Sequence, residues 1–198
     1  MERFGKSQSR LRSGVHNSAG VIAGKTKTEN TDMQLTARDV LSDCEIALEI
    51  LEDTEDVHRW RVLWAGAVAL ARTVGHVLRH VDRKEPQFRA AIDQRFELWK
   101  IERDANAVFW DFIEEERNNL LKEYKSRVSD AEEIPLGILP STEDFDSEET
   151  FLLGENLYRP ILSGYGEGED ARDIYKEALD WWERELSAIE AISAGTPP

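Results

Sequence analysis

Cysteine is almost absent from this sequence: Cys44 is the single one among 198 residues. A lone cysteine cannot form an internal disulfide, so the intrachain disulfide framework of small secreted domains is excluded. Cys44 falls on the apolar side of a segment with helical spacing, and we interpret it as a small buried hydrophobic residue. A reducing cytoplasm is the expected location.

Long uninterrupted apolar runs are also missing. The most apolar stretch, residues 62–81, contains Arg72, His76, Arg79 and His80, which argues against a transmembrane helix. The N-terminal residues carry charges but no continuous apolar segment, so they do not resemble a secretory signal. We therefore expect no membrane partner.

Basic residues are scarce beyond the N-terminal segment. The chain carries 25 Lys and Arg against 40 Asp and Glu, a formal net charge of −15. Residues 1–32 hold 6 basic and 3 acidic residues, and the remainder holds 19 and 37. A domain with this excess of negative charge repels a nucleic-acid backbone unless a local basic patch is present. The balance disfavours general nucleic-acid binding, but it permits a small catalytic cleft or a basic protein partner.

The N-terminal segment 1–32 is rich in Ser, Gly, Asn, Lys and Arg and has no helical or strand period. We expect it to be disordered. Met33 directly precedes the first helical signal, which suggests the hypothesis that translation starts there. Residues 33–198 are expected to form one helical-bundle domain.

Apolar residues repeat at helical spacing along most of that domain, and no segment alternates as a strand does. The pattern predicts an all-α bundle of four to five helices. Thr36 and Asp39 have capping-box-like spacing, Pro86 fits a first helical turn, and Asp170 is expected to cap the last helix. The expected helices cover 36–52, 55–82, a segment from 86, 105–128 and 171–192, and the third and fourth could form one kinked helix.

Between the last two helices lies a long acidic connection. Residues 129–150 hold eight Asp and Glu, no Lys or Arg, and two prolines. After it, residues 151–165 are expected to contain one short helical turn, and Gly164, Gly166 and Gly168 a flexible loop. One candidate function follows from this segment: a non-enzymatic interaction protein whose acidic loop engages a basic partner.

The stretch 115–124, EERNNLLKEY, contains an unusually placed arginine. Arg117 lies four residues after Ile113 and four before Leu121, so it falls on the apolar stripe of the expected helix. A buried or half-buried guanidinium needs carboxylate, carbonyl or phosphate partners. Asn118 and Lys122 are four apart and are expected to project beside it.

This Arg-Asn pair, followed by a basic residue and then an aromatic one, resembles the motif of the HEPN superfamily, Arg–polar–three residues–His. The resemblance implies a bundle of about four helices. It also implies a metal-independent RNase that needs no cofactor, pairs two motifs across a homodimer, and serves as a toxin or in antiviral defence. It would make Arg117, Asn118 and Lys122 the catalytic residues, with support from Asn119, Glu116 and Tyr124.

Lys122 departs from the family pattern, because it stands where the motif has histidine. Histidine exchanges a proton near neutral pH, whereas lysine normally stays charged. Lys122 could still stabilise a pentavalent phosphate, or act as an acid with a strongly depressed pKa. The departure favours a degenerate or regulatory member of the family over an efficient nuclease. RNA and a cognate basic protein are both candidate partners.

Three other interpretations compete with this one. Residues 115–124 could be a salt-bridged surface turn. His58, His76 and His80 could bind a metal in a bundle enzyme, although Arg72 and Arg79 would oppose a cation. Five aromatic residues near the C-terminus could stack on nucleic-acid bases: Tyr158, Tyr165, Tyr175, Trp181 and Trp182. Because the surrounding sequence is acidic, we expect them instead in the core or at an interface.

Overall fold

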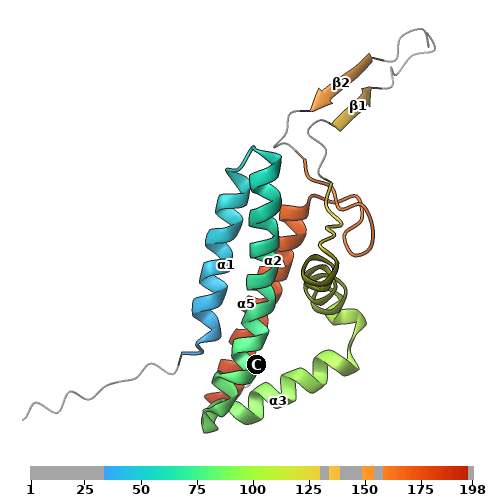
Figure 1. Ribbon diagram of the computed structural model, residues 1–198. Coiled ribbons are helices and arrows are strands. Elements are labelled where there is room, and N and C mark those ends of the chain that lie inside the picture. The colour runs from blue at the N-terminus through green and yellow to red at the C-terminus, as the bar shows by residue number, and fades with distance from the viewer. Residues whose placement is uncertain (1–33, 130–133, 139–148, 154–157, 196–198) are drawn as a thin grey trace, which may run out of the picture. The chain divides into compact units, whose positions relative to one another are not determined.

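The computed structural model describes residues 34–129, 134–138, 149–153 and 158–195 (Figure 1). The expected disorder of residues 1–32 and the expected start at Met33 lie outside these ranges. Most of the acidic connection 129–150 also lies outside the described ranges. The interaction with a basic partner that we expected of this connection therefore stays a prediction.

The predicted all-α bundle is confirmed. Its main helices are α1 (Ala37–Glu52), α2 (Val57–His80), α3 (Pro86–Ile101) and α5 (Ala171–Ser193). Helix α1 packs against α2 and α5, and α3 packs against α5 (Figure 1). A 3-10 turn, Asp82–Lys84, joins α2 to α3. In the part of the chain that is described, no helix is both long enough and apolar enough to cross a membrane.

The fourth predicted helix, 105–128, is divided into several short pieces. It begins with a 3-10 turn (Asp104–Asn106), which is followed by the π-helix η3 (Val108–Glu114). One α-helical turn, α4 (Glu115–Asn118), and a second π-helix, η4 (Asn119–Glu123), complete it. The helix ends at Tyr124, which adopts a left-handed conformation with φ of 52°. The predicted end at residue 128 is therefore wrong.

The π-helical geometry also changes which residues face the core. Hydrogen bonds in a π-helix join residues five apart instead of four, so the apolar stripe drifts out of phase with α-helical spacing. Leu121 and Tyr124, which follow Arg117 at the α-helical spacing of the apolar stripe, are 56% and 74% exposed. Val62 on the regular helix α2 and Val81 at its C-cap are also exposed, by 65% and 45%.

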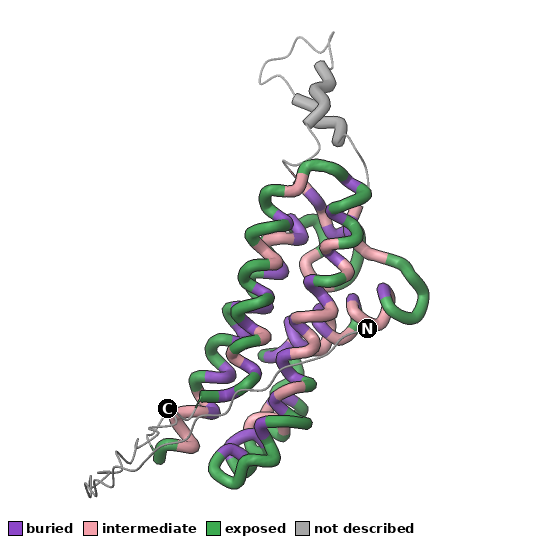
Figure 2. The backbone as a smooth tube through the Cα atoms, turned by 60° about the vertical axis from the view of Figure 1, so that its left-hand side comes forward, coloured by how far each residue is buried: buried purple, intermediate pink, exposed green. Residues whose placement is uncertain are grey.

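Buried residues line the helices of the bundle (Figure 2), and the core that they form contains many aromatic side chains. The ring centroid of Trp99 lies 5.5 Å from that of Phe109, 4.9 Å from Trp181 and 5.7 Å from Trp182. The interpretation of the Trp181–Trp182 pair as core is confirmed, since both are buried. Cys44 is fully buried as predicted, and burial raises the pKa of its thiol to about 12.

Two short strands were not predicted. Strand β1 (Ile134–Ile138) pairs antiparallel with β2 (Glu149–Leu153), with Leu136 opposite Phe151. Strand β2 occupies the beginning of the stretch 151–165, in which we expected a short helical turn, and residues 158–165 contain no helix. Residues 154–157 of that stretch lie outside the described ranges. The loop at 164–168 is present, and its three glycines all have positive φ, between 72° and 88°, a conformation that side chains disfavour.

Three aspartates cap helices at their N-termini in the described part of the chain. Asp56 caps α2, its carboxylate accepting a hydrogen bond from the Arg59 N–H at 2.8 Å. Asp170 caps α5 as predicted, its carboxylate accepting a hydrogen bond from the Arg172 N–H at 2.9 Å. The Thr36 side chain, by contrast, does not cap α1. The buried Asp82 carboxylate does so from the turn after α2, accepting from the backbone N–H groups of Thr36 and Ala37 at 2.9 and 3.0 Å. Sequence spacing gives no sign of this long-range cap.

Candidate functional site

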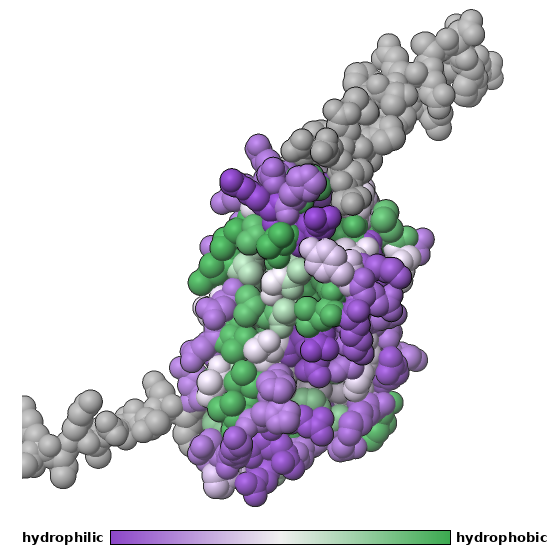
Figure 3. All heavy atoms as spheres, in the orientation of Figure 1, coloured by the Kyte–Doolittle hydropathy of each residue, from purple (hydrophilic) through white to green (hydrophobic). Residues whose placement is uncertain are grey.

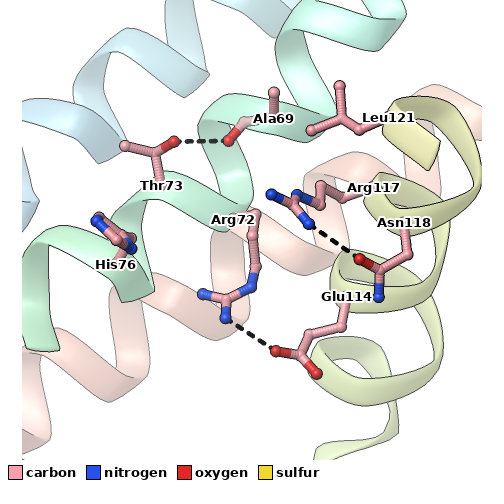
Figure 4. Close-up of a pocket in the computed structure, with 8 residues that line it drawn as sticks. All are labelled: Ala69, Arg72, Thr73, His76, Glu114, Arg117, Asn118 and Leu121. Carbon is pink, nitrogen blue, oxygen red and sulfur yellow. Dashed lines mark hydrogen bonds and ion pairs between the residues drawn. The ribbon is translucent and has the colours of Figure 1, made fainter.

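A pocket of about 270 Å³ lies between α2 and the segment formed by η3, α4 and η4 (Figure 4). Each of the two sides contributes four residues, in i, i+3, i+4 and i+7 positions, as a single helical face does. Most of these side chains are polar or charged. The lining residues are Ala69, Arg72, Thr73 and His76 from α2, and Glu114, Arg117, Asn118 and Leu121 from the facing segment.

Arg117 is half-buried in this pocket, as its position on the apolar stripe predicted. Its Nη1 donates a hydrogen bond to Oδ1 of Asn118 at 3.0 Å. Among the described residues no carboxylate lies within ion-pair distance of its guanidinium. The acceptor is a neutral amide, so the positive charge of Arg117 is left for an anion.

Arg72 reaches the same pocket from α2 and is neutralised there. Its Nη2 lies 2.9 Å from Oε1 of Glu114, and its guanidinium lies 5.7 Å from the centroid of the Phe109 ring. This ion pair joins the two sides of the pocket. Sequence reasoning missed Glu114 as a site residue and treated Arg72 only as a charge opposing a metal, because the pairing depends on how two separate helices pack.

The pocket also contains a histidine, which is contributed by α2 and does not occupy the histidine position of the HEPN-like motif. The exposed His76 lines the pocket, and its ring centroid lies 4.3 Å from that of His80, one turn further along. His58 lies in the first turn of the 24-residue helix α2, so the structure does not bring it together with His76 and His80. Within the described ranges, no group of three or more His, Cys, Asp or Glu side chains is arranged to hold a metal ion.

The structure separates Lys122 from Arg117 and Asn118. Lys122 is exposed in η4 and does not line the pocket. Tyr124 instead lines a smaller pocket of about 130 Å³ with Trp60 and Arg61. Asn119 is half-buried, and its backbone carbonyl accepts a hydrogen bond from the Lys125 N–H at 3.2 Å. Of the three residues that the resemblance makes catalytic, two share a site.

Glu116, expected to support Arg117, has another role. Its side chain is 1% exposed, and its carboxylate accepts hydrogen bonds from Trp64 Nε1 at 3.3 Å and from Ser126 Oγ at 3.2 Å. It also accepts from the backbone N–H of Arg127 at 3.2 Å and from Arg127 Nε at 3.0 Å. Glu116 therefore ties α4 to α2 and to the chain after η4. It does not face the pocket.

Comparison of this chain with protein-family models, with curated proteins and with solved structures found no match. The chemistry of the pocket is therefore what indicates a function. The pocket contains an arginine without a carboxylate partner among the described residues, an arginine–glutamate pair, an amide and an imidazole.

Proposed function

We propose that this chain is a HEPN-like protein that acts on RNA, and that the pocket between α2 and α4 holds an RNA phosphate against Arg117. One observation carries the proposal: the half-buried guanidinium of Arg117 has a neutral amide as its partner, 3.0 Å away, in a pocket open to ligand. A fork of N–H donors on a fixed positive charge suits the oxygens of a phosphate.

The neighbours of Arg117 favour the binding of a single phosphate group over the binding of a longer stretch of the RNA backbone. Asn118 orients the guanidinium through its Oδ1, and its amide nitrogen carries further N–H donors. Glu114 neutralises Arg72, so that among the described residues Arg117 is the arginine of the pocket without a carboxylate partner. Because the chain as a whole carries −15, an RNA strand would be held at this one place and repelled elsewhere.

The proposal includes a homodimer and a role in defence or toxin–antitoxin systems, as the resemblance implies. Exposed apolar side chains support self-association. On the face shown in Figure 3 apolar side chains gather over α1 and α2. These helices carry Ile46, Ile50 and Val62, which are 50%, 45% and 65% exposed. Exposed apolar patches of this kind mark protein interaction sites.

The test is a binding titration of the full chain with a short fluorescent single-stranded RNA, comparing wild type, Arg117→Ala and Arg117→Lys. Charge-assisted hydrogen bonds contribute about 1.5–3 kcal/mol, so Arg117→Ala should weaken binding roughly 10- to 100-fold. Arg117→Lys should fall in between, because it keeps the charge but loses the fork.

Arg184→Ala is the matched control, since Arg184 is an exposed arginine on α5 outside the pocket. It should bind RNA as wild type does. Equal affinities for wild type and Arg117→Ala, or no RNA binding by wild type, would contradict the proposed function.

A further inference from the structure

We propose that His76, contributed by α2, is the catalytic proton acceptor of the pocket, in the role that the motif position would assign to Lys122. The inference rests on the proposed function, because it needs an RNA phosphate at Arg117. Its basis is that His76 lines the pocket together with Arg117 and Asn118, whereas Lys122 is exposed outside it.

The other lining groups are poorly suited to accept a proton. Arg72 and Arg117 are guanidinium groups, which stay protonated in proteins. The carboxylate of Glu114 is engaged by Arg72 at 2.9 Å. The Thr73 hydroxyl donates to the Ala69 carbonyl at 2.8 Å. Imidazole is the one side chain in the lining that accepts and releases a proton readily near neutral pH.

The position of the imidazole fits this role. Figure 4 shows His76 at one end of the pocket and the guanidinium of Arg117 across from it, with Arg72 between them. The charged and titratable groups around His76 are Arg72 and His80 on its own helix, and Glu114 and Arg117 on the facing segment. A phosphate held by Arg117 would therefore occupy the same pocket as the imidazole of His76.

The step is an internal transfer within RNA. The 2′-hydroxyl gives its proton to the neutral imidazole of His76, the O2′–P bond forms and the P–O5′ bond breaks. The leaving 5′ oxygen takes a proton from water, and the imidazolium of His76 then releases its proton to solvent. The products are a 2′,3′-cyclic phosphate and a 5′-hydroxyl. Arg117 stabilises the charge that develops on the phosphate oxygens.

The experiment measures cleavage and binding of the same RNA by the full chain for wild type, His76→Ala, His76→Gln and Lys122→Ala. General base catalysis contributes about 100- to 10,000-fold, so both His76 variants should lose at least about 100-fold in rate. RNA affinity in these variants should stay within a few fold. Lys122→Ala should cleave at nearly the wild-type rate.

His58→Ala is the matched control, because His58 is an exposed histidine in the first turn of the same helix and does not line the pocket. It should retain activity. The wild-type rate should fall in acid as the base is protonated, and added imidazole should partly restore His76→Ala. An RNA with deoxyribose at the cleavage site should be bound but not cut.

The outcomes separate this inference from the proposed function. Absence of RNA binding by wild type would overturn both. Binding without cleavage by wild type would overturn the role of His76 alone. Cleavage retained in both His76 variants, or lost in Lys122→Ala, would do the same. Because His76 is exposed, its variants should fold, which a circular dichroism melt verifies.

Discussion

Glu116 and Arg117 are adjacent on α4 but serve different purposes. Glu116 is buried and accepts hydrogen bonds from Trp64, Ser126 and Arg127. Arg117 faces the pocket and has only the amide of Asn118 as a hydrogen-bond partner among the described residues. A helix turns by about 100° per residue, so neighbours point in different directions. The buried glutamate holds the turn, and the arginine is thereby available to a ligand.

Asp170 makes stability depend on pH. Burial alone would raise the pKa of its carboxyl, but hydrogen bonds from the Arg172 side chain and from the Arg159 and Arg172 N–H groups hold this pKa below its ordinary value. A lowered folded-state pKa contributes stability above the unfolded value, and this stability is lost as the pH falls. Stability should therefore drop below about pH 4.

We predict that Asp170→Asn lowers the free energy of unfolding by about 1–3 kcal/mol at neutral pH, because it removes a cap and charge-assisted hydrogen bonds. The deficit should shrink in acid, where the wild-type carboxyl is protonated. Urea titrations at several pH values measure both effects. Asp173→Asn, in the same first turn but exposed, should cost less than about 1 kcal/mol. A deficit in Asp170→Asn that is independent of pH would refute the role of the charge.

Two glycines of α2 provide a matched pair at the scale of the element. A Cβ at Gly75 would lie 2.8 Å from Cη2 of the buried Trp182 ring, whereas a Cβ at Gly66 would meet nothing within 4 Å. Gly75→Ala should therefore destabilise the bundle by about 1–3 kcal/mol through overpacking. Gly66→Ala should stabilise it by about 0.5–1 kcal/mol, since alanine favours the helix. Thermal denaturation of both variants tests this, and equal shifts would contradict close packing at Gly75.

The regular helices could be predicted because their apolar residues keep one period. Helices α1, α2 and α5 begin and end within about two residues of the predicted ranges, which is the usual uncertainty of helix ends. The π-helical segments η3 and η4 could not be predicted, because the sequence analysis assumed α-helical spacing throughout. The β1–β2 hairpin was also missed, because its strands lie in an acidic, proline-containing stretch that lacks alternation.

The candidate site was predicted on one side only. Arg117 and Asn118 were identified because a charged residue on an apolar stripe is unusual. On the facing side, His76 was considered only as a metal ligand and Arg72 only as a charge that would oppose a metal ion. Which face of α2 meets α4 depends on tertiary packing, and spacing within one helix carries no information about it.

At the scale of the whole molecule, the net charge of −15 should confine the proposed RNA contact to the pocket, and this limits the salt dependence of binding. Each phosphate neutralised on a single strand contributes a slope of about −0.7 in log K against log salt. Contact confined to the pocket involves one or two phosphates, so the slope should lie between about −0.7 and −1.4. Titrations at several salt concentrations measure it. A slope steeper than about −3 would mean that RNA runs over a broad basic surface.

The cap that Asp82 places on α1 joins residues 45 apart in the chain. A protein grows from its N-terminus during synthesis. The first turn of α1 therefore leaves the ribosome before the aspartate that will satisfy its N–H groups has been added. Helix α1 acquires its cap only after the whole of α2 and the following turn have emerged. The earliest folding unit of the nascent chain is thus expected to be the α1–α2 pair, complete to Asp82, and not α1 alone.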